Sequence, residues 1–282
     1  MAAAQELHSA RDPGPGVGTV ASDDRGLLYG DGVFRTFRHG PRGVWDREAQ
    51  FELLANDCRR LGLPPAPSAR LDAHIAEAVG DAENSSLVVR VTVTRGCGSR
   101  GYRPPSPAEP AVHVTVSQAP ERRSWDSGYR LRLCGLRLGH QPRLAGCKHL
   151  NRLENVLARA EWDDPEIDDG LLLDQAGCVV ETVSANLFWR RGKQVFTSAL
   201  DLAGVAGRQR ERVLEALQAS GMEVRIGHFP LQAWASADEA WVCNSVIGLR
   251  AVTAFGQLSL SPGPTAHALA MGPFVDWQPG AT

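Results

Sequence analysis

Between residues 171 and 196 short apolar runs alternate with turns, and this pattern constrains the fold more than any other feature of the chain. Turn residues separate the runs at Gln175–Gly177 and Arg190–Lys193. Runs this short, bounded by glycine, are typical of strands, because helices in globular proteins need about ten residues or more. The predicted strands are 171–174, 178–181, 187–189 and 194–196. We therefore expect a barrel-like sheet in the second half of the chain.

The remaining periodicities predict an α+β chain with two domains. Phe51, Leu54, Cys58 and Leu61 recur at helical spacing, and Asn151 followed by Glu154 resembles a capping box. The further predicted elements are helices over 47–63, 67–79, 151–162 and 208–220, and strands over 32–37, 87–94, 112–116, 129–133, 222–225 and 239–243. The domains we expect are a loose N-terminal arm over 1–23, a small α/β domain over 24–118, a linker over 119–128 and a large domain over 129–282.

Composition excludes several classes of protein. The net charge of -2 argues against a nucleic-acid binder that relies on a basic patch. The stretch Met1–Asp12 has no apolar core and no run of 18 apolar residues exists, so we expect neither a signal peptide nor a transmembrane helix. The six cysteines are scattered and form no C-x-x-C pair, so we expect no metal site. Unpaired thiols favour a reducing cytoplasm.

Lysine is rare in this chain. Only Lys148 and Lys193 are lysines among the 30 lysines and arginines. Lys193 lies in a predicted hairpin turn, where a solvated side chain without a catalytic role is the usual outcome. Lys148 stands between an apolar segment and a predicted helix start. A partly desolvated lysine there suits Schiff-base chemistry, although a junction lysine alone is more often structural.

Two further features accompany Lys148. Glu181 ends a predicted strand, where a carboxylate could lie on the floor of a cleft. Gly204–Gly207 leads into the helix predicted from Arg208, whose first backbone N–H groups could bind a phosphate. A lysine, a carboxylate and a phosphate-binding turn are the groups that hold pyridoxal 5'-phosphate. Each of these signals is weak alone.

The order of these three segments along the chain and their residue sequences make the pattern specific. The segments 148–154 (Lys-His-Leu-Asn-Arg-Leu-Glu), 181–189 and 204–207 resemble the fold type IV pyridoxal-phosphate family. Within that family they resemble the aminodeoxychorismate lyases more than the branched-chain or D-amino acid aminotransferases. Shorter matches lie at 24–26, 29–34, 95–102 and 244–245, so the resemblance spans about residues 24–255.

The resemblance implies a small N-terminal α/β domain, a larger cofactor-binding domain and a homodimer. It also implies conversion of 4-amino-4-deoxychorismate to 4-aminobenzoate and pyruvate. The roles it implies are Schiff-base formation and acid–base catalysis by Lys148; pairing of the pyridine nitrogen with Glu181; phosphate binding by the amides of Arg208 and Gln209 with Asn244 or Ser245; contact of Thr36 with the substrate; and carboxylate binding by Arg100 and Tyr102.

Two departures from the family pattern stand out. The family carries a phosphate-binding arginine in the first helix, at a position that falls on Leu53 or a neighbour here. We hypothesise that Arg208 replaces it. The family's N-terminal strand is also absent from the predicted arm. An aminotransferase of the same fold, or a binding protein that has lost the cofactor, is the alternative interpretation.

Overall fold

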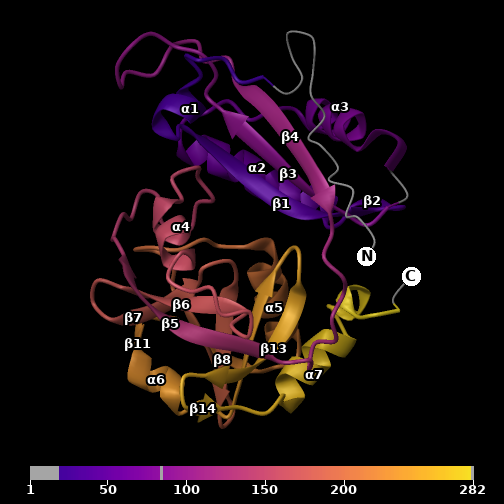
Figure 1. Cartoon of the computed structure of the whole chain (residues 1–282), viewed down its shortest axis with the longest axis vertical. Helices are drawn as coiled ribbons and strands as arrows, with labels where there is room; N and C mark the ends of the chain where they lie inside the picture. Colours follow the sequence, from indigo (N-terminus) through magenta and orange to yellow (C-terminus); the bar gives the residue numbers. More distant parts are fainter. Residues whose placement is uncertain (1–18, 83–84, 281–282) are drawn as a thin grey trace. The chain divides into compact units, whose positions relative to one another are not determined.

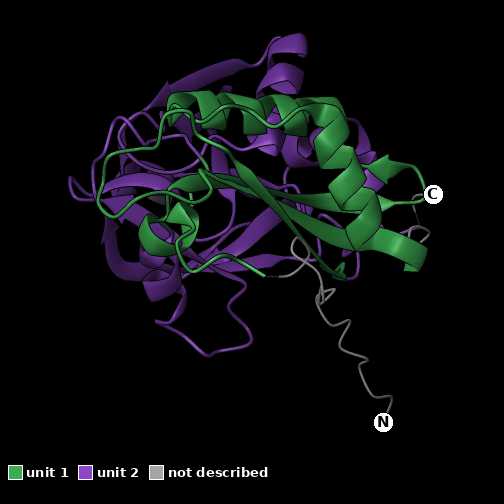
Figure 2. Ribbon diagram, turned by 90° about the horizontal axis from the view of Figure 1, so that it is seen from above, with its two compact units in different colours: residues 1–120, 148–151 green, residues 121–147, 152–282 purple. Residues whose placement is uncertain are grey.

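The computed structural model describes residues 19–82 and 85–280, which fall into two compact units (Figure 2). Unit 1 runs to Pro120 and includes Lys148–Asn151, and unit 2 comprises Glu121–Cys147 and the chain from Arg152 onward. The change of unit after Pro120 lies inside the segment predicted as a linker. Residues 148–151 cluster with unit 1, although their place in the sequence is within the second predicted domain. Most of the predicted arm, and any N-terminal edge strand, lies outside the described residues.

Unit 1 is a four-stranded antiparallel sheet with helices packed on it (Figure 1). The order of the strands is β2-β1-β3-β4. Two long helices pack on the sheet, and a short helix precedes it. The elements are α1 (Arg25–Tyr29), β1 (Gly32–Gly40), β2 (Gly43–Val44), α2 (Arg47–Arg60), α3 (Ser68–Val79), η1 (Gly80–Ala82), β3 (Leu87–Thr94) and β4 (Ala111–Gln118).

The period-two alternation of β3 explains how its sheet has two unlike faces. Val89 and Val91 are fully buried and Arg90 between them is exposed. Phe37 of β1 pairs with Val89 on the apolar face and contacts Phe51 of α2, at 6.5 Å between ring centroids. The opposite face carries Phe34 and polar side chains, among them Thr36 and Arg90. One face therefore forms the core of unit 1 with α2 and α3.

Unit 2 is built on a large, barrel-like mixed sheet (Figure 1). Ten strands of the described residues belong to it, in the order β10-β9-β8-β12-β13-β5-β6-β7-β11, with β14 paired to β13. Strands β9–β10, β5–β13 and β5–β6 pair in parallel, and the other pairs are antiparallel. The strands are β5 (Tyr129–Leu138), β6 (Asp169–Asp174), β7 (Cys178–Thr182), β8 (Asn186–Arg191), β9 (Gln194–Ser198), β10 (Glu223–Gly227), β11 (Phe229–Pro230), β12 (Glu239–Asn244), β13 (Gly248–Phe255) and β14 (Leu258–Ser259).

Aromatic side chains dominate the core of unit 2. The ring of Trp189 lies 5.7 Å from that of Phe196, 5.4 Å from Phe229 and 6.0 Å from Trp234, between centroids. Such clusters combine a large buried apolar area with favourable ring geometry. The helices of this unit are α4 (Leu153–Arg159), α5 (Arg208–Ala219), α6 (Leu231–Ala235), α7 (Pro264–Met271) and the 3-10 turn η2 (Val275–Trp277).

The helix predicted over 151–162 differs most from the structure. Helix α4 spans only Leu153–Arg159, and its first turn has no side-chain cap. The predicted capping box is therefore wrong: Glu154 instead accepts the N–H of Gly139 at 2.8 Å. The predicted apolar stripe is also not buried within the chain, because Leu153 is 74% exposed and Val156 is 59% exposed. Apolar periodicity shows that a face favours burial, but not what covers it.

Candidate active site

The segment that carries Lys148 lies along strand β1 of unit 1. The N–H of Phe34 donates to the carbonyl of Lys148 at 2.9 Å, and the N–H of Leu150 donates to the carbonyl of Gly32 at 3.0 Å. The Lys148 Nζ lies 4.7 Å from the centroid of the Phe34 ring. Backbone pairing and this cation–π contact fix the partly buried lysine against the open face of the sheet.

Two glycines, one in β1 and one just before it, make room for this segment. A Cβ on Gly30 would lie 2.5 Å from the Oδ1 of Asn151, and Gly30 also has a positive φ of 63°. A Cβ on Gly32 would lie 2.8 Å from the Cδ1 of Leu150 and 2.6 Å from the carbonyl oxygen of Val93. Asn151 in turn donates its Nδ2 hydrogen to the Gly30 carbonyl at 3.1 Å. The Tyr-Gly-Asp-Gly and Lys-His-Leu-Asn motifs of the sequence are therefore in direct contact.

Glu181 lies near the end of β7 in unit 2, with its carboxylate buried. Its Oε2 accepts the N–H of Val205 at 3.0 Å and an Nδ2 hydrogen of Asn186 at 3.3 Å. Asn186 also donates to the carbonyl of Val205 at 2.8 Å, and its Oδ1 accepts the N–H of Gly207 at 3.2 Å. The predicted carboxylate and the predicted glycine turn are thus joined through one asparagine.

The turn before α5 has the features of an anion-binding site. Gly207 is the extended N-cap residue of α5 and has no side chain that could cap the first turn of the helix. Gly204 has a φ of 84°, and a Cβ there would lie 2.8 Å from Val180 and 3.3 Å from the Glu181 carboxyl carbon. A helix N-terminus of this kind attracts phosphate through its backbone N–H groups and dipole.

Arg208 is placed at this helix start, but its charge is shared. Its Nη1 lies 3.6 Å from a carboxylate oxygen of Glu211 and 3.2 Å from one of Glu215, both on α5. The side chain of Arg208 is only 15% exposed. The guanidinium is therefore near the first turn and partly neutralised by two glutamates.

Asp169 organises the loop that joins Glu181 to Asn186. Its carboxylate accepts the hydroxyls of Thr182 and Ser184, each at 2.7 Å, and the N–H of Gly170 at 2.8 Å. Burial raises the pKa of Asp169 above its ordinary value, and these hydrogen bonds act in the opposite direction. The result is a buried carboxylate, 2% exposed, that fixes a loop next to the candidate site.

Asn244 stabilises the turn that carries Ser245. Its Oδ1 accepts the N–H groups of Val246 and Ile247, both at 2.8 Å, and its Nδ2 donates to the Ser184 carbonyl at 3.1 Å. Both ends of the Asn244 amide are thus used within unit 2, and Ser245 is partly exposed.

The predicted substrate-binding residues lie in unit 1. Thr36 is partly exposed on β1, beside Arg90 in the register of the sheet. Arg100 is exposed, and Tyr102 is 86% exposed with its ring 5.4 Å from that of Tyr29. The buried guanidinium of Arg25 holds this loop by donating to the carbonyls of Gly101 and Tyr102 at 2.8 and 3.1 Å.

Several residues beside the candidate groups carry no prediction from sequence. Asn186 lies in the segment 181–189 that resembles the family, and this resemblance was the sequence feature that could have indicated its role. A charge at a strand position that alternates with apolar neighbours was the signal for Arg35, which pairs with Asp57. The long-range partners of Arg25 and Asp169 leave no local pattern.

The buried cysteines have weakly acidic thiols. Burial raises the pKa of Cys58 and that of Cys243 to about 12, so both remain protonated thiols at neutral pH. None of the six cysteines forms a disulfide. Within residues 19–82 and 85–280, no group of three or more histidine, cysteine or acidic side chains is arranged to hold a metal ion.

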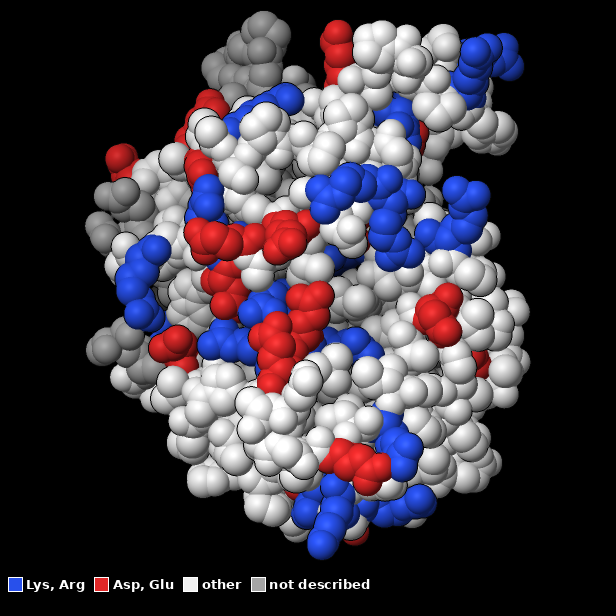
Figure 3. Space-filling view, turned by 180° about the vertical axis from the view of Figure 1, so that it is seen from behind, with Lys and Arg blue, Asp and Glu red and all other residues white. Residues whose placement is uncertain are grey.

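The surface adds two observations. Acidic and basic side chains are interspersed on the face shown in Figure 3. None of the helices in the part of the chain that the structure describes is both long and apolar enough to cross a bilayer.

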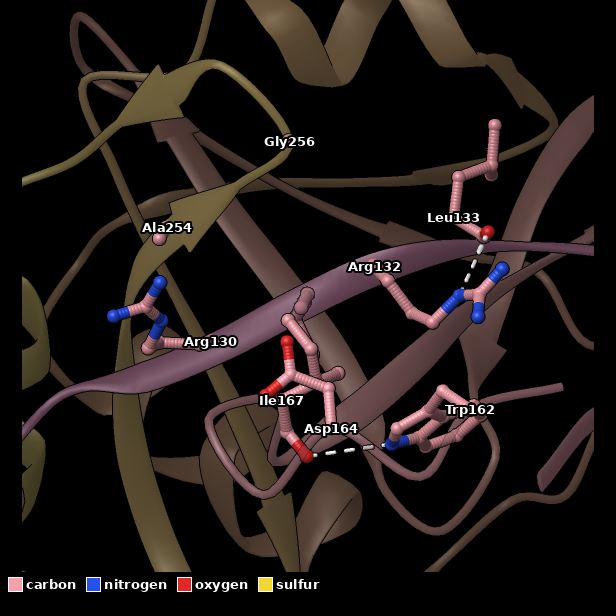
Figure 4. Close-up of a pocket in the computed structure, with 9 residues that line it drawn as sticks. Arg130, Arg132, Leu133, Trp162, Asp164, Ile167, Ala254 and Gly256 are labelled. Carbon is pink, nitrogen blue, oxygen red and sulfur yellow. Dashed lines mark hydrogen bonds between the residues drawn. The ribbon is translucent and has the colours of Figure 1, made fainter. Parts of the chain in front are cut away.

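A pocket of about 370 Å³ lies elsewhere on unit 2 (Figure 4). Arg130, Arg132 and Trp162 are among its lining residues, and the Trp162 Nε1 donates to the Ile167 carbonyl at 3.3 Å. None of the predicted site residues lines this pocket.

Known proteins resemble this chain over most of its length. Residues 32–255 match the model of the amino-transferase class IV family. The aminodeoxychorismate lyase of Vibrio harveyi is 39% identical over 83% of this chain and 86% of its own length. The crystal structure of 4-amino-4-deoxychorismate lyase from Pseudomonas aeruginosa superimposes with a TM-score of 0.82 at 36% identity, covering 91% of this chain and 96% of that one.

A more distant likeness concerns the fold alone. The branched-chain amino acid aminotransferase of Escherichia coli has a TM-score of 0.79 at 18% identity, covering 94% of this chain and 91% of that one. The predicted fold type IV architecture, with a small α/β unit and a larger unit on a barrel-like sheet, is confirmed.

Proposed function

Because the chain belongs to the amino-transferase class IV family, we propose that it is an aminodeoxychorismate lyase that converts 4-amino-4-deoxychorismate to 4-aminobenzoate and pyruvate, a step toward folate. The observation that carries the proposal is the identity of 39% to a lyase, which extends over 86% of that protein. The Lys-His-Leu-Asn-Arg-Leu-Glu segment at 148–154 supports the lyase over the aminotransferases of the same fold.

The cofactor that we propose is pyridoxal 5'-phosphate. The buried carboxylate of Glu181 suits a protonated ring nitrogen, and the first turn of α5, with Gly207 as its N-cap, suits a phosphate. The amides of Arg208 and Gln209 would hold the phosphate, and Ser245 would add a hydroxyl from the turn that Asn244 stabilises. When bound, the cofactor supplies an electron sink next to the substrate amine.

Residues of the chain itself would supply the other functions that the reaction needs. The amine of Lys148 would hold the cofactor and would remove the proton from the amine-bearing carbon of the substrate. Glu181 keeps a proton on the ring nitrogen through its negative charge. Thr36 faces the substrate, and Arg100 and Tyr102 bind its carboxylates. Loss of pyruvate from the neighbouring carbon leaves an aromatic ring, which makes the step downhill.

We also propose a cytoplasmic homodimer. Leu153, Val156 and Leu157 are 74%, 59% and 59% exposed on α4, which is an unusual concentration of apolar side chains for the surface of a monomer. A second copy of the chain is the partner that the family leads us to expect. The absence of disulfides among the six cysteines supports a reducing compartment.

A pyruvate-release assay tests the activity. We expect the wild-type protein to release pyruvate and 4-aminobenzoate from 4-amino-4-deoxychorismate, and Lys148→Ala to release neither. Lys193→Ala is the matched control, because it removes the other lysine of the chain and keeps Lys148. Transfer of the amino group to 2-oxoglutarate would instead identify an aminotransferase. A colourless protein that pyridoxal phosphate does not turn yellow would identify a binding homologue without cofactor.

A further inference from the structure

A buried ion pair lies next to the backbone of Lys148 in unit 1. Arg35 of β1 and Asp57 of α2 have side chains that are 3% and 2% exposed, and the Arg35 Nη2 lies 2.5 Å from the Asp57 Oδ2. The same Oδ2 accepts the backbone N–H of Lys148 at 3.3 Å. One carboxylate oxygen therefore links a buried cation to the main chain of the lysine.

The fold does not require charges at these positions. Arg35 lies between Val33 and Phe37 on the apolar face of β1, and both of these neighbours are buried hydrocarbons. A buried ion pair loses about as much free energy by desolvation as it gains by attraction, so a hydrophobic pair is often equally stable. The Nε of Arg35 also lacks a hydrogen-bond partner among the described residues. The pair therefore contributes little net stability, which points to a role beyond stability.

We propose that Arg35 and Asp57 are a positioning pair for Lys148. Asp57 fixes the main chain of the lysine, and the opposite charges of Asp57 and Arg35 offset each other at its amine. This inference rests on the proposed function, in which Lys148 holds the cofactor. Both side chains are almost fully buried, so they act through Lys148 and do not touch cofactor or substrate.

The charged surroundings of Lys148 in unit 1 give the sign of each effect. Its Nζ faces the Phe34 ring at 4.7 Å, and the guanidinium carbon of Arg90 lies 3.8 Å from the same ring centroid. Arg90 from β3 and Arg35 from β1 both disfavour an ammonium group, and Asp57 from α2 favours one. Removal of the Asp57 charge should therefore lower the pKa of the Lys148 amine, and removal of the Arg35 charge should raise it.

The two lysines of the chain allow a direct measurement. Full-length protein freed of cofactor is labelled with a trace of acetic anhydride across a range of pH, and peptide mass spectrometry reads Lys148 and Lys193 separately. The pH dependence of each labelling rate gives the pKa of each amine. Lys193 lies in the exposed turn between β8 and β9 and serves as the internal control.

We expect Asp57→Asn to lower the pKa of the Lys148 amine and Arg35→Met to raise it, each by about one pH unit. Arg35→Met/Asp57→Asn should return it to the wild-type value, because the double variant is again net neutral and its new amide oxygen can still accept the Lys148 N–H. The Lys193 pKa should not change. Shifts of one sign in both single variants, or none, would overturn the proposal. If Arg35→Met does not fold, the Lys148 pKa of Asp57→Asn is compared with that of the double variant. Equal values would overturn the proposal.

Two controls separate the possible failures. Glu239→Gln breaks another ion pair, between the buried Glu239 and the partly exposed Arg190 at 2.5 Å in unit 2, and should destabilise the fold without moving the Lys148 pKa. Borohydride reduction of the wild-type holoenzyme should attach the cofactor to Lys148. If that label is absent, the proposed function is wrong; if it is present and the pKa values do not move, only the positioning role is wrong.

Discussion

The carboxylate of Glu181 accepts the backbone N–H of Val205 at 3.0 Å, which fixes the candidate ring-binding group to the candidate phosphate-binding turn. Asn186 reinforces the link because it contacts Glu181, Val205 and Gly207. The two halves of the candidate cofactor site in unit 2 therefore hold each other in place.

Glu181→Gln tests the charge in this arrangement. The amide oxygen can still accept the Val205 N–H, but a neutral side chain no longer favours a protonated ring nitrogen. We expect pyruvate release to fall on the order of a hundredfold or more, with little change in thermal stability. Glu181→Asp, which keeps the charge on a shorter side chain, should retain more activity than Glu181→Gln. Equal activity of Glu181→Gln and wild type would remove Glu181 from the mechanism.

Asp169→Asn tests the buried carboxylate behind this loop. Burial raises the pKa of Asp169 above its ordinary value of 3.8, so Asp169 binds a proton more tightly in the folded state than in the unfolded state. The stability that this raised pKa contributes is present below pH 3.8 and is lost as pH rises through the raised value. The unfolding free energy of wild type minus that of Asp169→Asn should fall over that range, by about 1.4 kcal/mol for every tenfold difference in proton affinity between the folded and unfolded states.

Denaturant titrations of both proteins between pH 4 and pH 8 measure this difference, and other titrating groups cancel between them. A difference that grows with pH would show that the hydrogen bonds from Thr182 and Ser184 outweigh burial. Weaker cofactor binding by Asp169→Asn is expected as well, since the loop between Glu181 and Asn186 loses its anchor.

Local pattern predicted much of this structure. Alternation of apolar and polar residues identifies β3, and short apolar runs bounded by glycine identify β6 to β9, because the side chains of consecutive strand residues point to opposite faces. The pairing of Lys148 with Phe34 joins segments more than 100 residues apart, and no local pattern records it. Strand β13 is missed because Arg250 interrupts its apolar run, although that side chain is buried at 3% exposure. The site residues came from motif resemblance, whereas their partners Arg35, Asp57 and Asp169 required the fold.

The exposed face of α4 leads to a prediction about assembly. Val156→Glu places a charge among Leu153 and Leu157, and a carboxylate buried in a dimer interface carries a large desolvation cost. We expect sedimentation velocity to show a dimer for wild type and a monomer for Val156→Glu at micromolar concentration. Ile226→Glu is the matched control, since Ile226 on β10 is similarly exposed, at 54%. A dimer that survives Val156→Glu would place the interface elsewhere.

Gly204→Ala probes the close approach beneath Glu181. The added Cβ would lie 2.7 Å from Leu200 and 2.8 Å from Val180, in a backbone conformation with a φ of 84°. Strain and overpacking together should cost about 2–4 kcal/mol of unfolding free energy. Gly192→Ala is the control, because Gly192 has a φ of 59° but nothing within 4 Å of the added Cβ. Its loss should be about 1–2 kcal/mol. Equal losses in the two variants would contradict a crowded turn at Gly204.

Arg208→Ala tests whether this arginine replaces the one missing from α2. If its guanidinium reaches the phosphate, its loss removes a charge-assisted hydrogen bond, which contributes about 1.5–3 kcal/mol. Cofactor affinity should then fall roughly tenfold to a hundredfold, measured by fluorescence titration of the cofactor-free protein. Glu215→Gln should have the opposite effect, because Glu215 lies 3.2 Å from the Arg208 Nη1 and competes for its charge. Unchanged affinity in both variants would show that the backbone N–H groups of α5 hold the phosphate without this side chain.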